Sequence, residues 1–159
     1  MCPPWITPEK LAVLTMLCTE LERQASPWMA VGGLAGNLWG SDWPLHDLDF
    51  DVTSDALAQL AAHFRSRVVR QGRYVDEEFD LDLLRLNIGG VEVDLSSVDD
   101  AYCFTPAGVR TVLPNTLGRR VLRPLGALSL PCQHLEDLLA YKATIGREQD
   151  VRNLERLRR

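Results

Sequence analysis

The chain has 159 residues, of which 46% are hydrophobic and 25% are charged, and its formal net charge at pH 7 is −5. This length and composition are typical of one soluble globular domain and leave too little chain for two well-developed cores. The acidic charge argues against nonspecific binding along nucleic acid, and no run of about 18 apolar residues is present to span a membrane.

The cysteines and the N-terminus indicate the compartment. Cys2, Cys18, Cys103 and Cys132 are scattered without a CxxC pair, so we interpret them as reduced thiols. The opening stretch MCPPWITPEK lacks the basic start and apolar run of a signal peptide. We therefore expect a cytoplasmic protein.

The first half of the chain alternates helices and short strands. Thr7 and Pro8 form a helix start, and apolar residues then follow helical spacing to about Gln24. The expected elements that follow are a buried strand at 28–31, a short helix at 34–40, a strand within 45–53 and an amphipathic helix that Ser54 caps.

The second half begins with strands and ends with helices. A strand is expected at 67–71, and strands at 81–88 and 91–97 meet at Gly89-Gly90, a two-residue hairpin signal. Short strands are expected at 109–113 and 119–123, followed by helices at 134–145 and 148–159. This order predicts an α+β fold with a small, partly antiparallel sheet.

The strand LHDLDFDVT carries three aspartates at alternate positions, Asp47, Asp49 and Asp51. Side chains on a strand alternate between its faces, so the three carboxylates are expected to point the same way. Like charges on one face repel each other, and a bound cation would remove that repulsion.

Two further features belong with these aspartates. Gly32-Gly33 directly follows a strand and opens an expected helix, where glycines allow a phosphate to approach the backbone closely. In GVEVDLSS the apolar residues alternate with Glu92 and Asp94, so one face of that strand presents carboxylates. Magnesium prefers oxygen ligands from a few carboxylates and substrate phosphates. Asp47, Asp49 and Asp94 are thus expected to hold two Mg²⁺ ions beside a triphosphate on the glycine turn.

These residues resemble the DNA polymerase β-like nucleotidyltransferase superfamily. VGGLAGNLWGSDWPLHDLDF contains the Gly-Gly and Asp-x-Asp elements of its signature, and VEVDL supplies the third carboxylate. The closing helices are similar to those of small bacterial members, with Lys142 and the Gly146-Arg147 to Asp150 turn near the nucleotide. The resemblance covers about residues 28–157 and is greatest for small lincosamide and aminoglycoside nucleotidyltransferases and related toxins.

The resemblance implies a single nucleotidyltransferase-like domain over 1–159. A small mixed or antiparallel sheet at about 26–131 would be flanked by helices, with closing helices at about 132–158. It further implies transfer of a nucleoside monophosphate from an NTP, such as ATP, to a hydroxyl acceptor, which we expect to be a small molecule. Asp47, Asp49 and Asp94 would hold metal and act in catalysis, Gly32, Gly33, Lys142 and Arg147 would bind nucleotide, and Asp94 or Glu92 would serve as general base.

The chain departs from the antibiotic enzymes at two points. They carry Asp-Gly-Gly-Trp where this chain has Val31 and Leu34 around the glycines, and residues 34–46 contain no Lys or Arg. Triphosphate contact must then come from Lys142, Arg147 or the cluster Arg119, Arg120 and Arg123, which is equally well explained as a solvated face.

The remaining residues and functions stay open. Asp51 is expected to form hydrogen bonds at the strand end, with metal contact as the alternative. His46 is expected to be a loop residue, with substrate contact as the alternative. Trp28, Trp39 and Trp43 are expected to pack in the core, unless one of them stacks on a base or lines the acceptor pocket. The alternatives to a small-molecule enzyme are a toxin that modifies tRNA or protein and an inactive nucleotide-binding or partner-binding module. A homodimer would complete the acceptor side of the cleft.

Overall fold

The structure is a computed structural model that describes residues 2–158. Its helices are α1 (Pro8–Arg23), α2 (Gly32–Leu38), α3 (Ser54–His63), α4 (Leu135–Thr144) and α5 (Glu148–Glu155). Its strands are β1 (Trp28–Ala30), β2 (Leu48–Val52), β3 (Val68–Val75), β4 (Phe79–Ile88), β5 (Val91–Ser97), β6 (Tyr102–Phe104), β7 (Arg110–Val112), β8 (Val121–Leu125) and β9 (Leu128–Cys132).

The strands form one curled, mixed sheet. Its order is β7-β6-β4-β5-β2-β1-β9-β8, and β3 pairs with β4 outside this path. β2 runs parallel to β5 and β1 parallel to β9, whereas the other neighbouring pairs are antiparallel. The predicted α+β class, with its small mixed sheet between helices, is confirmed.

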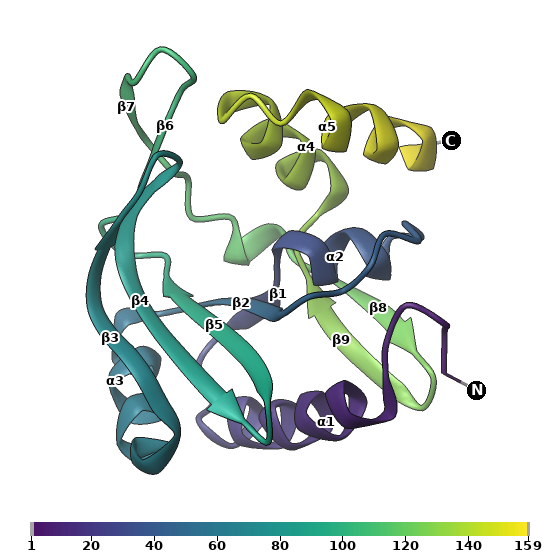
Figure 1. Cartoon of the computed structure of the whole chain (residues 1–159), viewed down its shortest axis with the longest axis vertical. Helices are drawn as coiled ribbons and strands as arrows, with labels where there is room; N and C mark the ends of the chain where they lie inside the picture. Colours follow the sequence, from purple (N-terminus) through teal and green to yellow (C-terminus); the bar gives the residue numbers. More distant parts are fainter. Residues whose placement is uncertain (1, 159) are drawn as a thin grey trace.

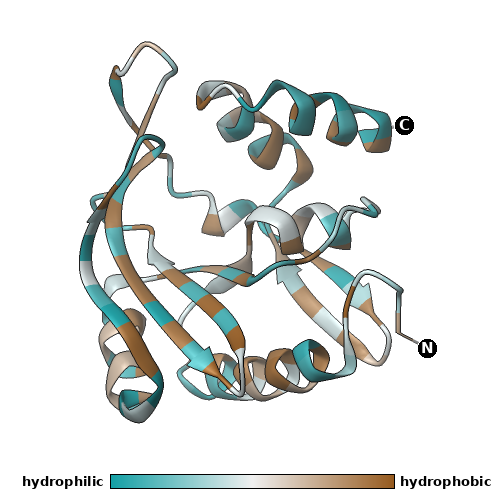
Figure 2. Cartoon of the chain, viewed as in Figure 1, coloured by the Kyte–Doolittle hydropathy of each residue, from teal (hydrophilic) through white to brown (hydrophobic). Residues whose placement is uncertain are grey.

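Helices cover both faces of the sheet. In Figure 1, α1 and α3 lie below it, and α2, α4 and α5 lie above it. Hydrophobic and hydrophilic residues alternate along β4 and β5 (Figure 2), so each strand offers one apolar face. The apolar face of β2, formed by Leu48, Phe50 and Val52, is completely buried in the core beside Val93 and Leu95 of β5. The aspartates of β2 consequently point to the other face, toward α2 and α4.

Local signals in the sequence explain two of these elements. The Thr7 side chain accepts a hydrogen bond of 3.2 Å from the backbone N–H of Lys10, which caps α1 as expected. Gly89 and Gly90 have φ values of +58° and +87°, which a two-residue hairpin turn requires, and they join β4 to β5.

Other boundaries differ from the expectation. The aspartate strand is only Leu48–Val52, so Asp47 directly precedes β2, because pairing with β5 begins at Leu48. Helix α2 begins two residues early, at Gly32, and Thr53 rather than Ser54 caps α3 by accepting from the N–H of Ala56. Strands β6 and β9 were not predicted, since β6 has only three residues and β9, which forms a hairpin with β8, contains Pro131. Among residues 2–158, no helix combines the length and the apolar character that crossing a membrane requires.

Candidate active site

The parallel pairing of β2 with β5 aligns acidic side chains in rows across the sheet. Asp49 of β2 is in register with Asp94 of β5, and Asp51 is in register with Ser96. Residues in register on adjacent strands share a face of the sheet, with the strands about 4.8 Å apart. The structure thus brings Asp94 beside the aspartates of the DLD motif, and Val93 and Leu95 point away from them into the core.

Three carboxylates converge at the end of these two strands. One oxygen from each of Asp47, Glu92 and Asp94 lies within 4.8 Å of the others. Three hard oxygen donors at this spacing fit a divalent cation such as Mg²⁺, because a single ion would neutralise charges that otherwise repel. Glu92, which the sequence presented only as a candidate general base, is therefore a candidate ligand as well.

Asp49 is turned toward the glycine turn. Gly32 has a φ of +59°, and a Cβ placed on it would lie 2.6 Å from Asp49 Oδ2. The backbone N–H of Val31 donates to the carbonyl oxygen of Asp49 at 3.0 Å, which fixes the turn against β2. The first residue of α2 and the second aspartate of the motif are thus in direct contact, as a shared nucleotide-metal site requires.

Burial and mutual repulsion act on the carboxyl groups of β2. The pKa of Asp49 is raised well above its usual value by burial, then by the charges of Asp47 and Asp94, while Lys142 opposes the shift. Burial alone raises the pKa of Asp51 from 3.8 to about 7. The expected hydrogen bond to Asp51 is absent within residues 2–158, and its side chain instead lines the cleft. The site therefore favours a cation beside Asp49.

Arg85 is a site residue that the sequence did not reveal. It lies on β4 in register with Asp94, and its Nε and Nη2 donate to the two Asp94 oxygens at 2.8 and 3.1 Å. Its Nε is also 3.7 Å from Glu92 Oε1. An arginine in an alternating strand is ordinarily a solvent-facing residue, and only the β4–β5 register shows that it meets the acidic cluster.

The closing helices carry two of the predicted nucleotide-binding cations, of which Arg147 lines the cleft. Lys142 of α4 is buried, and its Nζ forms an ion pair of 2.9 Å with Asp150 Oδ2 of α5. Arg147 lies between the two helices, lines the cleft, and donates from Nε to Glu78 Oε2 at 2.7 Å. Both cations are near the acidic face, and both already have a carboxylate partner.

The alternative cluster of arginines has other contacts. Arg119 pairs with Asp137, Arg120 donates to the carbonyl oxygen of Leu117, and Arg123 lies over the Trp39 ring and donates to Leu38. None of these three arginines is among the residues that line the cleft.

The tryptophans of the motif region serve mainly in packing. Trp28 is buried beside Phe50, and Trp43 Nε1 donates to the carbonyl oxygen of Gly33 at 3.0 Å. Trp43 also lies against Gly36, where a Cβ would fall 1.9 Å from its ring. Trp43 thereby packs against α2 and holds the glycine turn at its start in position.

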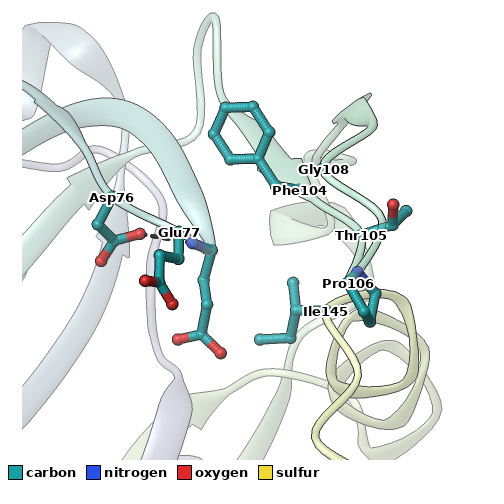
Figure 3. Close-up of a pocket in the computed structure, with 8 residues that line it drawn as sticks. Asp76, Glu77, Phe104, Thr105, Pro106, Gly108 and Ile145 are labelled. Atoms are coloured by element: carbon teal, nitrogen blue, oxygen red, sulfur yellow. Dashed lines mark hydrogen bonds between the residues drawn. The ribbon is translucent and has the colours of Figure 1, made fainter.

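The cleft has an inner chamber and an outer groove. The chamber has a volume of about 260 Å³, and its walls include Gly32, Asp49, Asp94, Arg85 and Tyr141. The groove is more open, with a volume of about 810 Å³, and shares Asp76 and Glu78 with the chamber. Figure 3 shows the acidic side chains of the β3–β4 turn on one side of the groove, and Phe104, Pro106 and Ile145 on the other.

Known structures share this architecture. A nucleotidyltransferase candidate from Thermotoga maritima superposes with a TM-score of 0.75 at 21% identity, covering 95% of this chain and 93% of that one. The lincosamide antibiotic adenylyltransferase LnuA, solved with lincomycin bound, gives a TM-score of 0.58 at 16% identity over 96% and 98% of the two chains. The antibiotic-resistance factor ANT(2'')-Ia, in complex with adenylyl-2''-tobramycin, gives a TM-score of 0.62 at 12% identity over 94% and 93% of the two chains.

The chain has the nucleotidyltransferase fold. At these identities the likeness establishes the architecture, and it agrees with the family resemblance of the sequence motifs. No protein-family model matches the chain, and no curated protein does either. The chain therefore shares the nucleotidyltransferase architecture with proteins of low sequence identity. At such identities the fold does not identify the substrate, for which the residues of the site are the evidence.

Proposed function

We propose that this chain is a divalent-metal-dependent nucleotidyltransferase that moves a nucleoside monophosphate from an NTP to a hydroxyl group of a small molecule. The observation that carries the proposal is the row formed by Gly32, Asp49 and Asp94, with Asp47 and Glu92 at its end. A structural sheet has no use for five such residues on one face, whereas metal-dependent phosphoryl chemistry needs carboxylates next to a phosphate-binding turn.

Each residue has a role in this scheme. Asp47, Asp49 and Asp94 hold the metal, which supplies charge neutralisation and activation of the acceptor oxygen when it is bound. Gly32 and Gly33 let the triphosphate approach the backbone. Glu92 is the candidate general base, since its pKa is raised by desolvation and by Asp94 and Asp47, while Arg85 opposes the shift. Its side chain is 47% exposed, so an incoming hydroxyl can reach it.

The acceptor would enter through the outer groove. The groove is the larger of the two spaces and adjoins the chamber at Asp76 and Glu78. Its apolar wall suits a compact organic acceptor rather than a polyanion. A nucleic-acid acceptor is disfavoured because acidic side chains line the groove, and because Arg119 and Arg158, two exposed arginines outside the cleft, are paired with Asp137 and Glu136. The free thiols of the described cysteines suit a reducing cytoplasm.

The test is calorimetric binding of ATP, GTP, CTP and UTP with and without Mg²⁺, followed by pyrophosphate release with candidate hydroxyl acceptors. Asp49→Asn should abolish metal-dependent transfer and leave the fold intact, with equal or higher metal-free stability, because it removes one of several repelling charges. Asp42→Asn, an exposed loop substitution, is the matched control. A sharp fall in melting temperature with activity retained would make Asp49 structural and refute the assignment.

A further inference from the structure

Arg85 occupies the carboxylate that metal is proposed to use. Its guanidinium covers both oxygens of Asp94 in the fork arrangement that arginine forms with carboxylates. Its side chain is 28% exposed, lines the chamber, and has its Cζ 6.0 Å from the Tyr74 ring centroid. The guanidinium is therefore part of the cleft, held between an acid and an aromatic ring.

Arg85 and a divalent ion cannot both keep Asp94 in this geometry. The ligand group of Asp47, Glu92 and Asp94 includes two carboxylates that Arg85 already contacts. A guanidinium and a divalent cation on the same carboxylate repel each other strongly in a partly buried site. Metal binding must then weaken or break the Arg85–Asp94 pair, and the free energy needed to break that pair opposes metal binding.

Once Arg85 is released from Asp94, a phosphate group of the nucleotide is its expected partner. Residues 34–46 supply no cation, and Lys142 and Arg147 are already paired with Asp150 and Glu78. Neither of those partners belongs to the acidic row, so metal binding does not free these two cations. Arg85 is thus the cleft cation whose release is coupled to metal, and a phosphate group is the bidentate acceptor that suits it next.

We propose that Arg85 is a substrate-positioning residue. It pairs with Asp94 in the metal-free protein, and its guanidinium moves to pair with a phosphate group of the nucleotide once metal occupies the carboxylates. This inference rests on the proposed function. Residues 34–46, between the glycine turn and the DLD motif, contain no Lys or Arg to contact the triphosphate. Arg85 on β4 would supply that positive charge.

The first experiment measures Mg²⁺ binding alone, by calorimetry on the full chain without nucleotide. Arg85→Gln should bind Mg²⁺ about tenfold more tightly than the native protein, because the competing charge-assisted hydrogen bonds are gone. The matched control is Arg73→Gln. Arg73 is 32% exposed and pairs with Asp80 at 2.8 Å across the neighbouring strands β3 and β4, but it lies outside the residues that line the cleft. Its substitution should leave Mg²⁺ affinity unchanged.

The second experiment measures inorganic triphosphate binding at saturating Mg²⁺, which is independent of the preferred base. Arg85→Gln should weaken this binding about tenfold, whereas Arg85→Lys, which keeps the charge but loses the fork, should weaken it less. Melting curves with and without Mg²⁺ verify folding, and Arg85→Lys replaces Arg85→Gln in the Mg²⁺ titration if the glutamine variant does not fold.

The outcomes separate the two proposals. Equal Mg²⁺ affinity in native and Arg85→Gln proteins overturns the competition while leaving the nucleotidyltransferase function standing. Tighter Mg²⁺ binding with unchanged triphosphate affinity overturns the transfer of Arg85 to phosphate. Absence of Mg²⁺ binding in both proteins overturns the proposed function, and this inference with it.

Discussion

Gly32 and Gly33 look equivalent in the sequence, but the structure separates them. Gly32 has a left-handed φ of +59° and would place a Cβ 2.6 Å from Asp49 Oδ2. Gly33 has no such φ, and a Cβ there would meet only Trp43 Nε1, at 3.9 Å. A side chain at position 32 would therefore strain the backbone, whereas one at position 33 would not. A role of Gly33 in close phosphate approach stays a prediction.

Gly32→Ala should lower the free energy of unfolding by about 2 kcal/mol, because an alanine in the left-handed region is strained and its Cβ pushes on Asp49. Mg²⁺-dependent triphosphate affinity should fall with it, since the displaced carboxylate is a proposed ligand. Urea unfolding and calorimetry measure the two effects. Gly33→Ala is the control and should keep its stability or gain slightly, as glycine is a poor helix residue. Similar losses for both variants would contradict the distinction.

The candidate site was predictable from the sequence only where alternation alone decides the geometry. Asp47, Asp49 and Asp94 could be placed on one face because strand side chains alternate, and the β2–β5 register agrees with that expectation. Arg85 could not be found in this way, because its contact with Asp94 depends on the register of β4 against β5. The same holds for Tyr141, which reaches the chamber only through the packing of α4.

At the scale of elements, the β4–β5 hairpin sets the alignment of the site. Its two-residue turn fixes Asn87 opposite Glu92 and, two residues further, Arg85 opposite Asp94. Because a slip of one residue would turn every side chain to the other face, the turn determines which carboxylates share the cleft. The turn and both strands were predicted from Gly89-Gly90 and the flanking alternation. β6 and β9 were missed because a three-residue strand and a strand containing Pro131 carry little pattern of their own.

Gly89→Val should destabilise the protein by about 1–2 kcal/mol, since a β-branched residue is strained at a φ of +58°. No atom lies within 4 Å of the position where a Cβ would be added, so the loss would come from the backbone and not from a clash. Gly89→Asn is the matched variant, because asparagine tolerates the left-handed region, and it should cost much less. Equal stability of the two variants in urea unfolding would show that the turn does not need a left-handed residue.

At the scale of the whole molecule, the fold places its uncompensated negative charge on one face of the sheet. The opposite face of β2 and β5 is apolar and lies in the core, while the cleft face concentrates aspartates. Several acids elsewhere are paired with arginines, as in Asp80 with Arg73 and Glu136 with Arg158. In the described chain, the cleft is thus the place where folding brings carboxylates together against their electrostatic repulsion. A bound cation would stabilise the fold most there.

This charge distribution gives a pH dependence with a defined sign. Burial raises the pKa of Asp51 from 3.8 to about 7, and the pKa of Asp49 is raised as well. The folded protein therefore binds more protons than the unfolded chain between about pH 4 and 7, so stability decreases as pH rises through this window. The pKa values of Glu20, Asp80 and Glu136 are lowered from ordinary values near 4, so their stabilisation is lost only at lower pH.

We accordingly expect the metal-free protein to be less stable at pH 8 than at pH 5, with Asp51 contributing about 2.6 kcal/mol to the difference. Asp51→Asn, which stays neutral, should flatten this profile and raise the free energy of unfolding at pH 8, while Asp55→Asn on the exposed side of α3 should leave the profile unchanged. Urea unfolding in EDTA between pH 5 and 8 measures all three proteins. If the free energy of unfolding of Asp51→Asn depends on pH as steeply as that of the native protein, Asp51 is ionised in the folded protein across this range. Burial would then not control the protonation of the carboxyl groups on the acidic face of the cleft.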